Sequence, residues 1–370
     1  TSVIQRPVSD LTAGTFATSY KFLKEFRMAF FPMSVNEVTG DWLSEVLGYP
    51  AELKDIRPLG EGFGVLSLVS RIKLDSALGP KSLIAKLPSP VPENRDVARE
   101  YDNYGREYRF YTEVAPTIPV RSAKCHYGAF EHDSYKFVLL LEDLQEYRLG
   151  DQVKGCREQD VRMVINTIAQ LHANTWRATG YKGVANHNSA MQRDAVKSGF
   201  EMGWPVVLDQ FADLVPGAAR SVGEKIPGAL GRLMDEFSKE PLCIAHGDVR
   251  LDNIFFGENE VVFVDWQAVC HSAPEHDLAY FLTQSVPTDI REKEDWVAIY
   301  HQALTDQGTE YSLNTCRDRY QKCALYLLSY AVIIAGILDM GNERGMALAR
   351  TLLGNSLGSL TSLGAFDLVS

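Results

Sequence analysis

The sequence lacks several features that would point to a class of protein at once. Its 370 residues include six cysteines, but none forms a Cys-x-x-Cys pair, so neither a zinc site nor a disulfide framework is expected. No Gly-Lys pair occurs anywhere, which excludes a Walker A loop. There is also no internal repeat and no low-complexity tract. The chain reads as an ordinary globular protein with reduced thiols.

An excess of basic residues is also lacking. Lys and Arg number 37 against 48 Asp and Glu, which gives a formal net charge of −11. A general nucleic-acid binder needs a basic face for phosphates, so we expect no nucleic-acid partner. An acidic protein can still hold an anionic ligand where a few donors cluster locally.

We expect no hydrophobic run that is long enough to cross a bilayer. The most membrane-like stretch, residues 323–338, is closed in by Lys322 and Asp339 and falls short of the ~20 apolar residues that a spanning helix needs. The first residues carry no basic region followed by an apolar core. We therefore expect a soluble, cytoplasmic protein without a membrane span, in which this stretch is a buried core helix.

Strand-like segments precede helical ones along the chain. A capping box at Ser34–Glu37 predicts a helix that runs to Leu47. From residue 160 onward helical patterns dominate, apart from a strand-like stretch at 243–264. Between these regions, short apolar or β-branched runs predict strands at 56–59, 65–74, 82–87, 124–130 and 135–141, with one helix at 97–114.

This order predicts an α+β fold of two lobes. The length allows two or three domains, or two lobes of one unit. We expect an N-terminal helical region at 1–50, a small strand-rich lobe at 51–143 and a large helical lobe at 144–370.

A glycine-rich loop lies between the first two predicted strands. Gly60, Gly62 and Gly64 alternate with Glu61 and Phe63, and glycines let a backbone turn tightly and approach a phosphate. A strand follows the loop, whereas a dinucleotide fingerprint needs a helix there. Strand, glycine loop and strand is the form of a kinase-type loop, and a plain hairpin turn is the alternative.

A lysine is embedded in the apolar strand at 82–87. Burying Lys86 is costly unless it meets an anion, although a lysine on an edge strand can also reach solvent. A carboxylate partner is expected on the following helix. Glu100 and Glu107 are seven residues apart and share a helix face, so spacing leaves both open.

The strongest functional signal is the run from His246 to Asn253, His-Gly-Asp-Val-Arg-Leu-Asp-Asn, followed by an apolar strand and Asp265. Phosphoryl transfer from ATP needs a carboxylate that orients the attacking hydroxyl and accepts its proton. It also needs oxygen ligands for Mg²⁺. Asp248, Asn253 and Asp265 offer these groups at suitable spacing. The pattern predicts phosphoryl-transfer chemistry.

These residues resemble the aminoglycoside phosphotransferase and choline kinase-like family, which are relatives of protein kinases. With Asp265-Trp266-Gln267, the run is most similar to the bacterial branch and to the ecdysteroid kinase-like group. The similarity spans residues 56–282 and is most specific at His246–Asn253. It implies a protein-kinase-like fold and an enzyme that uses ATP and Mg²⁺ to phosphorylate a hydroxyl of a small molecule.

The resemblance also implies individual roles. Asp248 is expected to be the catalytic base, with Arg250 facing the γ-phosphate, and Asn253 and Asp265 are expected to hold Mg²⁺. Glu107 lies in a run similar to the family's Glu-x-x-Phe-Tyr helix and is the expected partner of Lys86, with Glu100 as fallback. The other expected nucleotide-binding residues are Gly60, Gly62, Phe63 and Gly64 of the loop, where Val65 departs from the final glycine of the family pattern, and Glu142 and Leu144 at the hinge.

The acceptor is less well specified. Only residues 266–273 separate Asp265 from Pro274-Glu275, which leaves little room for the activation segment of a protein kinase. A helical insert at 179–244 suits a small-molecule pocket instead. The candidate residues leave two acceptor classes open. One is a cationic aminoglycoside or choline (Asp209, Asp213, Glu275). The other is an apolar alcohol such as a sterol, a macrolide or a hydroxyacyl group, including a hydroxyacyl-CoA (Trp204, Trp266, Tyr280).

A second hypothesis is a nucleotide-binding pseudokinase that acts as an interaction module. Loss of Lys86, Asp248, Asn253 or Asp265 would favour it, and all four are present. The sequence does not specify an oligomeric state.

Overall fold

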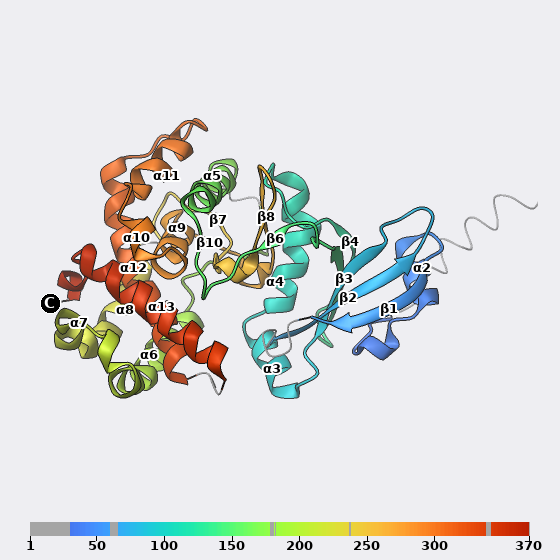
Figure 1. The fold of residues 1–370 in the computed structure, drawn as a ribbon, viewed down its shortest axis with the longest axis horizontal. Coiled ribbons are helices and arrows are strands. Elements are labelled where there is room, and N and C mark those ends of the chain that lie inside the picture. The colour runs from blue at the N-terminus through green and yellow to red at the C-terminus, as the bar shows by residue number, and fades with distance from the viewer. Residues whose placement is uncertain are drawn as a thin grey trace, which may run out of the picture.

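Two lobes make up the part of the chain that the structure describes, as seen in Figure 1. The structure is a computed structural model and describes residues 30–59, 66–177, 181, 183–236, 238–337 and 342–369. A sheet with flanking helices forms the small lobe, and helices form most of the large lobe. The α+β, two-lobed architecture predicted from the sequence is confirmed.

The small lobe is built on a five-stranded antiparallel sheet in the order β1-β2-β3-β5-β4. β5 is the most buried strand because its Phe-Val-Leu-Leu-Leu core has apolar side chains on both faces. The five predicted strands are present, with ends that differ by a few residues. Their bounds are β1 (Glu52–Pro58), β2 (Ser67–Asp75), β3 (Ser82–Pro88), β4 (Cys125–Glu131) and β5 (Lys136–Glu142).

The first described helix begins later than the sequence predicted. Ser34 precedes only a short 3₁₀ turn (Val35–Glu37) and makes no side-chain cap, and the Glu37 carboxylate accepts from the Met33 amide at 2.8 Å and not from the Ser34 amide. Helix α2 (Gly40–Leu47) begins after Thr39, whose hydroxyl accepts from the Trp42 amide at 3.2 Å. The predicted capping box is therefore wrong. Most of the predicted N-terminal region, residues 1–29, lies outside the described residues.

The single helix predicted at 97–114 is two helices. Asp102 has φ = 52°, a left-handed conformation that no helix continues through. This residue separates α3 (Pro92–Glu100) from α4 (Asn103–Arg109), which runs on into a π-helical turn. In Figure 1, α4 lies between the sheet and the large lobe.

The large lobe packs around α12 (Leu313–Ile337). This helix is long and apolar enough to cross a membrane by length and composition, but 61% of its apolar window is buried inside the protein. It packs against α6, α9 and α13, as expected of a core helix. The other helices are α5 (Glu158–Asn174), α6 (Ala190–Gln210), α7 (Gly217–Val222), α8 (Ile226–Glu236), α9 (Glu275–Tyr280), α10 (Thr288–Arg291), α11 (Trp296–Thr305) and α13 (Glu343–Ser362).

Two small sheets in the large lobe carry the predicted motif. β7 (Cys243–Ala245) pairs with β10 (Cys270–Ser272), and β8 (Ile254–Phe256) pairs with both β6 (Arg148–Leu149) and β9 (Val261–Phe263). The run His246–Asn253 connects β7 to β8, and Asp265 follows β9. Pairing of β8 with β9 therefore brings both parts of the motif to one side of the lobe.

Candidate functional site

The loop from His246 to Asn253 is fixed by its backbone. Gly247 has φ = 82°, and a Cβ atom there would lie 2.4 Å from the carbonyl oxygen of Ala268. Only glycine fits both constraints without strain. The amides of His246 and Gly247 donate to the two carboxylate oxygens of Asp277, at 2.7 and 2.9 Å. The loop is thus attached to α9 through one carboxylate.

Asp277 is buried in a polar network. The imidazole of His172, on α5, lies 3.2 Å from its carboxylate and 2.7 Å from the Tyr300 hydroxyl. Burial alone would raise the pKa of Asp277, but the hydrogen bond and charge of His172 outweigh burial and lower it to about 2. Asp277 is therefore an ionised anchor for the loop.

Asp248 and Asn253 face each other across the loop. The Asn253 amide nitrogen donates to the Asp248 carboxylate at 2.8 Å and to its carbonyl oxygen at 3.0 Å. The Arg250 Nε atom lies 3.5 Å from the same carboxylate. The negative charge of Asp248 raises the pKa of Arg250, so the guanidinium stays charged.

Lys86 joins the two lobes. Its ammonium nitrogen lies 2.7 Å from Glu107 Oε2, on α4, and 2.6 Å from Asp265 Oδ1 in the large lobe. Burial would lower the pKa of Lys86, but the charges of Asp265 and Glu107 outweigh burial and raise it. The charge of Lys86 in turn lowers the pKa of Asp265. The structure thus places Glu107, not Glu100, beside Lys86, while Glu100 is exposed at the end of α3.

The donor set fits a hard divalent cation. Because Asn253 donates through Nδ2 to Asp248, its amide oxygen is the atom that it can offer to a metal. Asp265, a left-handed residue (φ = 65°) two positions after the end of β9, adds carboxylate oxygens. Oxygen donors of this kind suit Mg²⁺, which also takes ligands from phosphates and water.

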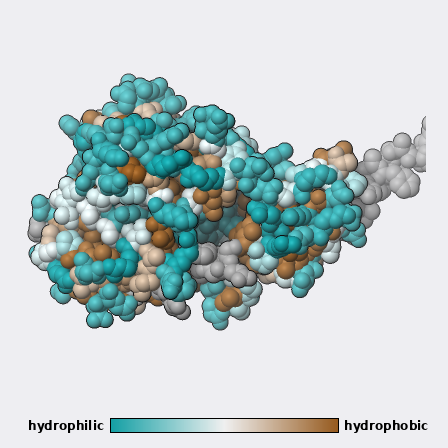
Figure 2. All heavy atoms as spheres, in the orientation of Figure 1, coloured by the Kyte–Doolittle hydropathy of each residue, from teal (hydrophilic) through white to brown (hydrophobic). Residues whose placement is uncertain are grey.

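The remaining predicted nucleotide residues fall into two groups. Gly60, Gly62, Phe63 and Gly64 lie outside the described residues. Glu142 and Leu144 lie where the chain leaves β5 for the large lobe, and the Glu142 carboxylate accepts from Arg121 at 2.6 Å and from the Lys124 amide at 3.0 Å. Leu144 is buried in the main core. The surface is hollowed between the lobes, as Figure 2 shows.

Sequence reasoning missed three groups that support this site. Gln152 accepts from the Leu251 amide at 2.9 Å and donates to the Gln284 carbonyl at 2.6 Å, which ties the loop to the large lobe. Phe110 stacks on Trp266 with ring centroids 3.6 Å apart. His172 is the third. No local pattern marks Gln152, whereas the aromatic residue in the Glu-x-x-Phe-Tyr run could have pointed to the stacking of Phe110.

The acceptor candidates differ in their surroundings. Asp213 pairs with Arg350 on the surface, and Glu275 is buried beside Arg319. Trp204 is buried in the core, as is Trp266, and Asp209 is exposed on α6. Of these residues, Tyr280 lies beside Asp248. Burial, together with the charge of Asp248 and a hydrogen bond to it, raises the pKa of the Tyr280 phenol.

Further tyrosines continue from Tyr280 into the large lobe. Its ring centroid lies 5.9 Å from that of Tyr330, and the hydroxyls of Tyr326 and Tyr330 are 3.3 Å apart. Gln192, on α6, donates to the Tyr330 hydroxyl at 3.0 Å. Burial raises the pKa of all three phenols, so this tyrosine cluster (Tyr280, Tyr326, Tyr330) is uncharged.

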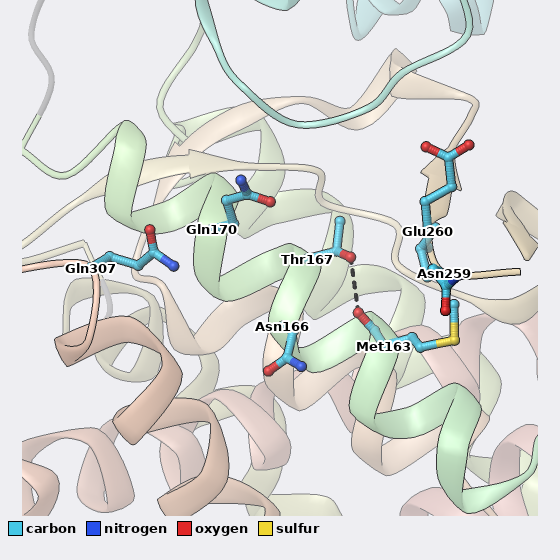
Figure 3. Close-up of a pocket in the computed structure, with 8 residues that line it drawn as sticks. Met163, Asn166, Thr167, Gln170, Asn259, Glu260 and Gln307 are labelled. Atoms are coloured by element: carbon cyan, nitrogen blue, oxygen red, sulfur yellow. Dashed lines mark hydrogen bonds between the residues drawn. The ribbon is translucent and has the colours of Figure 1, made fainter. Parts of the chain in front are cut away.

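A pocket of ≈ 340 Å³ opens elsewhere on the large lobe, between α5 and the turn that joins β8 to β9. Figure 3 shows polar side chains from both elements around it, together with Gln307. None of the predicted site residues that the structure describes lines this pocket. Its lining residues are Met163, Asn166, Thr167, Gln170, Asn259, Glu260, Val261 and Gln307.

Comparison with known families identifies the chain. Residues 61–312, more than half of its length, match the ecdysteroid kinase-like family. The chain belongs to this family. It is therefore a kinase-like phosphotransferase by family, as the resemblance of the His246–Asn253 run indicated. A search of curated proteins found no match.

Solved structures share the fold at low sequence identity. An aminoglycoside phosphotransferase in complex with GDP and kanamycin has a TM-score of 0.54 at 14% identity, over 86% of this chain and 97% of its own. Ethanolamine kinase of Plasmodium vivax has a TM-score of 0.54 at 13% identity, over 96% and 98%. Choline kinase of Cryptosporidium parvum has a TM-score of 0.55 at 11% identity, over 85% and 92%.

Proposed function

We propose that the protein is a kinase that uses ATP and Mg²⁺ to phosphorylate a hydroxyl group of a small molecule. The observation that carries this proposal is the convergence of distant residues. Lys86 and Asp265, 179 positions apart, are joined at 2.6 Å, and Asp248 and Asn253 are joined at 2.8 Å in the adjoining loop. A lysine, a base and two oxygen ligands are the groups that phosphoryl transfer requires.

Each residue has a separate task in this proposal. Asp248 orients the acceptor hydroxyl and takes its proton, while Asn253 holds the Asp248 carboxylate in position. Lys86 binds the α- and β-phosphates and is itself positioned by Glu107. Asn253 and Asp265 would hold Mg²⁺, which neutralises phosphate charge when it is bound.

Arg250 is the residue best suited to meet the transferred phosphoryl group. The Arg250 Nε atom is buried and has no hydrogen-bond partner among the described residues, although it lies 3.5 Å from the Asp248 carboxylate. A charged guanidinium with a donor to spare can stabilise the oxygens of the phosphoryl group as negative charge develops on them.

For the acceptor we propose an uncharged alcohol. The side chains that extend from Asp248 are the neutral tyrosine cluster and Gln192, which donate and accept hydrogen bonds but offer no anion to an ammonium group. Asp213 and Glu275, which could have favoured a cation, already pair with arginines. A steroidal alcohol is the acceptor type that the family description suggests, whereas some relatives in the fold act on choline or ethanolamine.

An acceptor panel tests both parts of the proposal. We expect release of ADP from ATP and Mg²⁺ to depend on an ecdysteroid or a related sterol, and not on kanamycin, choline or a hydroxyacyl-CoA. Asp248→Asn should lower the rate by ~10²–10⁴-fold, because it removes the base, while equilibrium binding of ATP persists. Asp318→Asn, an exposed residue on α12, is the matched control and should leave the rate unchanged.

The outcomes separate the hypotheses. Full turnover by Asp248→Asn would overturn the assignment of the base. Phosphorylation of kanamycin or choline would overturn the uncharged acceptor but retain the kinase. Binding of ATP without transfer to any acceptor or to water would identify a pseudokinase instead.

A further inference from the structure

Three metal-binding side chains meet in the large lobe outside the proposed nucleotide site. His187 precedes α6, Cys270 lies in β10 and His276 lies in α9. One potential ligand atom from each residue lies within 4.8 Å of the other two. These residues are far apart in the sequence, with no Cys-x-x-Cys or His-x-x-x-His spacing, so sequence reasoning could not find the cluster.

The two imidazoles are in the protonation state that a metal needs. Burial lowers the pKa of His187 well below its usual value and that of His276 to about 4. Both rings are therefore neutral near pH 7, and each carries a lone pair that can bind a cation. Burial raises the pKa of the Cys270 thiol to about 12, so binding of a cation there must release the thiol proton.

The surroundings hold the cluster in place. His187 Nε2 is hydrogen-bonded to the Tyr326 hydroxyl at 2.8 Å, an outer contact of the kind that orients metal-binding imidazoles. The His187 amide donates to the His271 carbonyl at 2.9 Å, next to Cys270. Cys270 itself pairs with Ala245 in the β7–β10 sheet. The three donors thus belong to elements fixed by backbone hydrogen bonds.

The donor types select the cation. Two nitrogens and one sulfur, without a carboxylate, suit Zn²⁺ and not Mg²⁺, which prefers oxygen. Arg106 opposes a cation here, because its positive charge acts on both His187 and Cys270. It adds to the lowering of the His187 pKa by burial and works against the raising of the Cys270 pKa by burial. Ionisation of the thiol supplies one negative charge that offsets this repulsion.

We propose that His187, Cys270 and His276 form a Zn²⁺ site with three protein ligands, separate from the Asn253 and Asp265 site. Binding breaks the S–H bond of Cys270, forms a zinc–thiolate bond and releases one proton to solvent. The bound ion would join the segment before α6 to β10 and α9. Because Ala245 and Asp277 adjoin Cys270 and His276, the ion would stabilise the elements that carry the His246–Asn253 loop.

Cobalt provides the sharpest test, because Co²⁺ takes the same ligands as Zn²⁺ and a thiolate bound to it absorbs in the near ultraviolet. The full chain, freed of metal with a chelator, is titrated with Co²⁺ and then with Zn²⁺. We expect one equivalent of Co²⁺ to produce a thiolate charge-transfer band and one equivalent of Zn²⁺ to remove it. Zn²⁺ should also raise the melting temperature.

Matched variants locate the site. Cys270→Ser should abolish the band, whereas Cys243→Ser, at a buried cysteine on the paired strand β7, should retain it. His276→Gln gives a second test if Cys270→Ser does not fold. Tyr326→Phe should weaken Zn²⁺ binding by ~10–100-fold, as expected for an outer-contact residue. Absence of the band in the wild type, or its persistence in folded Cys270→Ser or His276→Gln, would overturn the proposal.

Discussion

Gly247 shows how much a single residue constrains the candidate site. It lies between the histidine and the aspartate of the His-Gly-Asp motif, where the backbone is left-handed and the carbonyl of Ala268 is in contact. Any side chain at this position must strain the backbone and displace the peptide that joins Ala268 to Val269. The glycine of the motif is therefore required by backbone geometry and not by chemistry.

Substitution of this glycine should be costly. Gly247→Ala should lower the free energy of unfolding by about 1–3 kcal/mol from the left-handed backbone alone, and the contact with Ala268 adds to this. Gly228→Ala, at an open position in α8, is the control and should raise it by ~0.5–1 kcal/mol. Urea unfolding of both variants measures the difference. Equal stability of the two variants would contradict the role given to Gly247.

At the scale of elements, α9 is the support for the loop. The Asp277 carboxylate on α9 accepts hydrogen bonds from two loop amides. It also contacts His172 on α5, which is hydrogen-bonded to Tyr300 on α11. An ionised carboxylate in this position contributes stability only while it remains charged. This makes the attachment of the loop sensitive to acid.

The direction in which stability changes with pH follows from the pKa of Asp277, which is about 2 in the folded chain against an ordinary 3.8. Its stabilising contribution, about 2 kcal/mol, is fully present above pH 4 and is lost as the pH falls through 2. We expect the gap in unfolding free energy between wild type and Asp277→Asn to be largest near pH 6 and to shrink toward pH 2. Denaturant unfolding at several pH values measures it, and a constant gap would refute this account.

Sequence patterns located the elements well but not their ends. The β-branched and apolar runs marked all five strands of the small lobe, because strand formation there depends on local burial. The predicted helix starting after Ser34 was wrong, because Glu37 accepts from the Met33 amide and Thr39 caps the helix instead. The break at Asp102 was missed because a left-handed aspartate leaves no clear mark in the sequence.

At the scale of the molecule, Lys86 and Asp265 join the two lobes at the candidate site. The sequence identified the members of the site that share a motif, such as Asp248 and Asn253. It left the choice between Glu100 and Glu107 to the family resemblance, because seven residues of spacing place both on one helix face. Gln152 and the Phe110–Trp266 stack depend on packing between distant segments, which no local pattern encodes.

Nucleotide binding across the lobes should stabilise the whole chain. A ligand at 100 times its Kd adds about 2.7 kcal/mol to the unfolding free energy, so ATP with Mg²⁺ should raise the melting temperature. In Asp265→Asn the effect of ATP should no longer depend on Mg²⁺, because a metal ligand is lost. Thermal melts with ATP, with and without Mg²⁺, test this. A variant that keeps the full Mg²⁺ dependence would exclude Asp265 as a ligand.

Because Lys86 contacts Asp265, a metal ion that binds Asp265 must compete with the Lys86 ammonium group. The carboxylate that is expected to hold a divalent cation is already neutralised by an internal ammonium ion at 2.6 Å. A metal arriving alone competes with that ammonium ion, whereas a metal arriving with phosphates gives Lys86 new anions to bind. The chain should therefore discriminate against free Mg²⁺ and accept it together with the nucleotide, a form of selectivity set by one salt bridge.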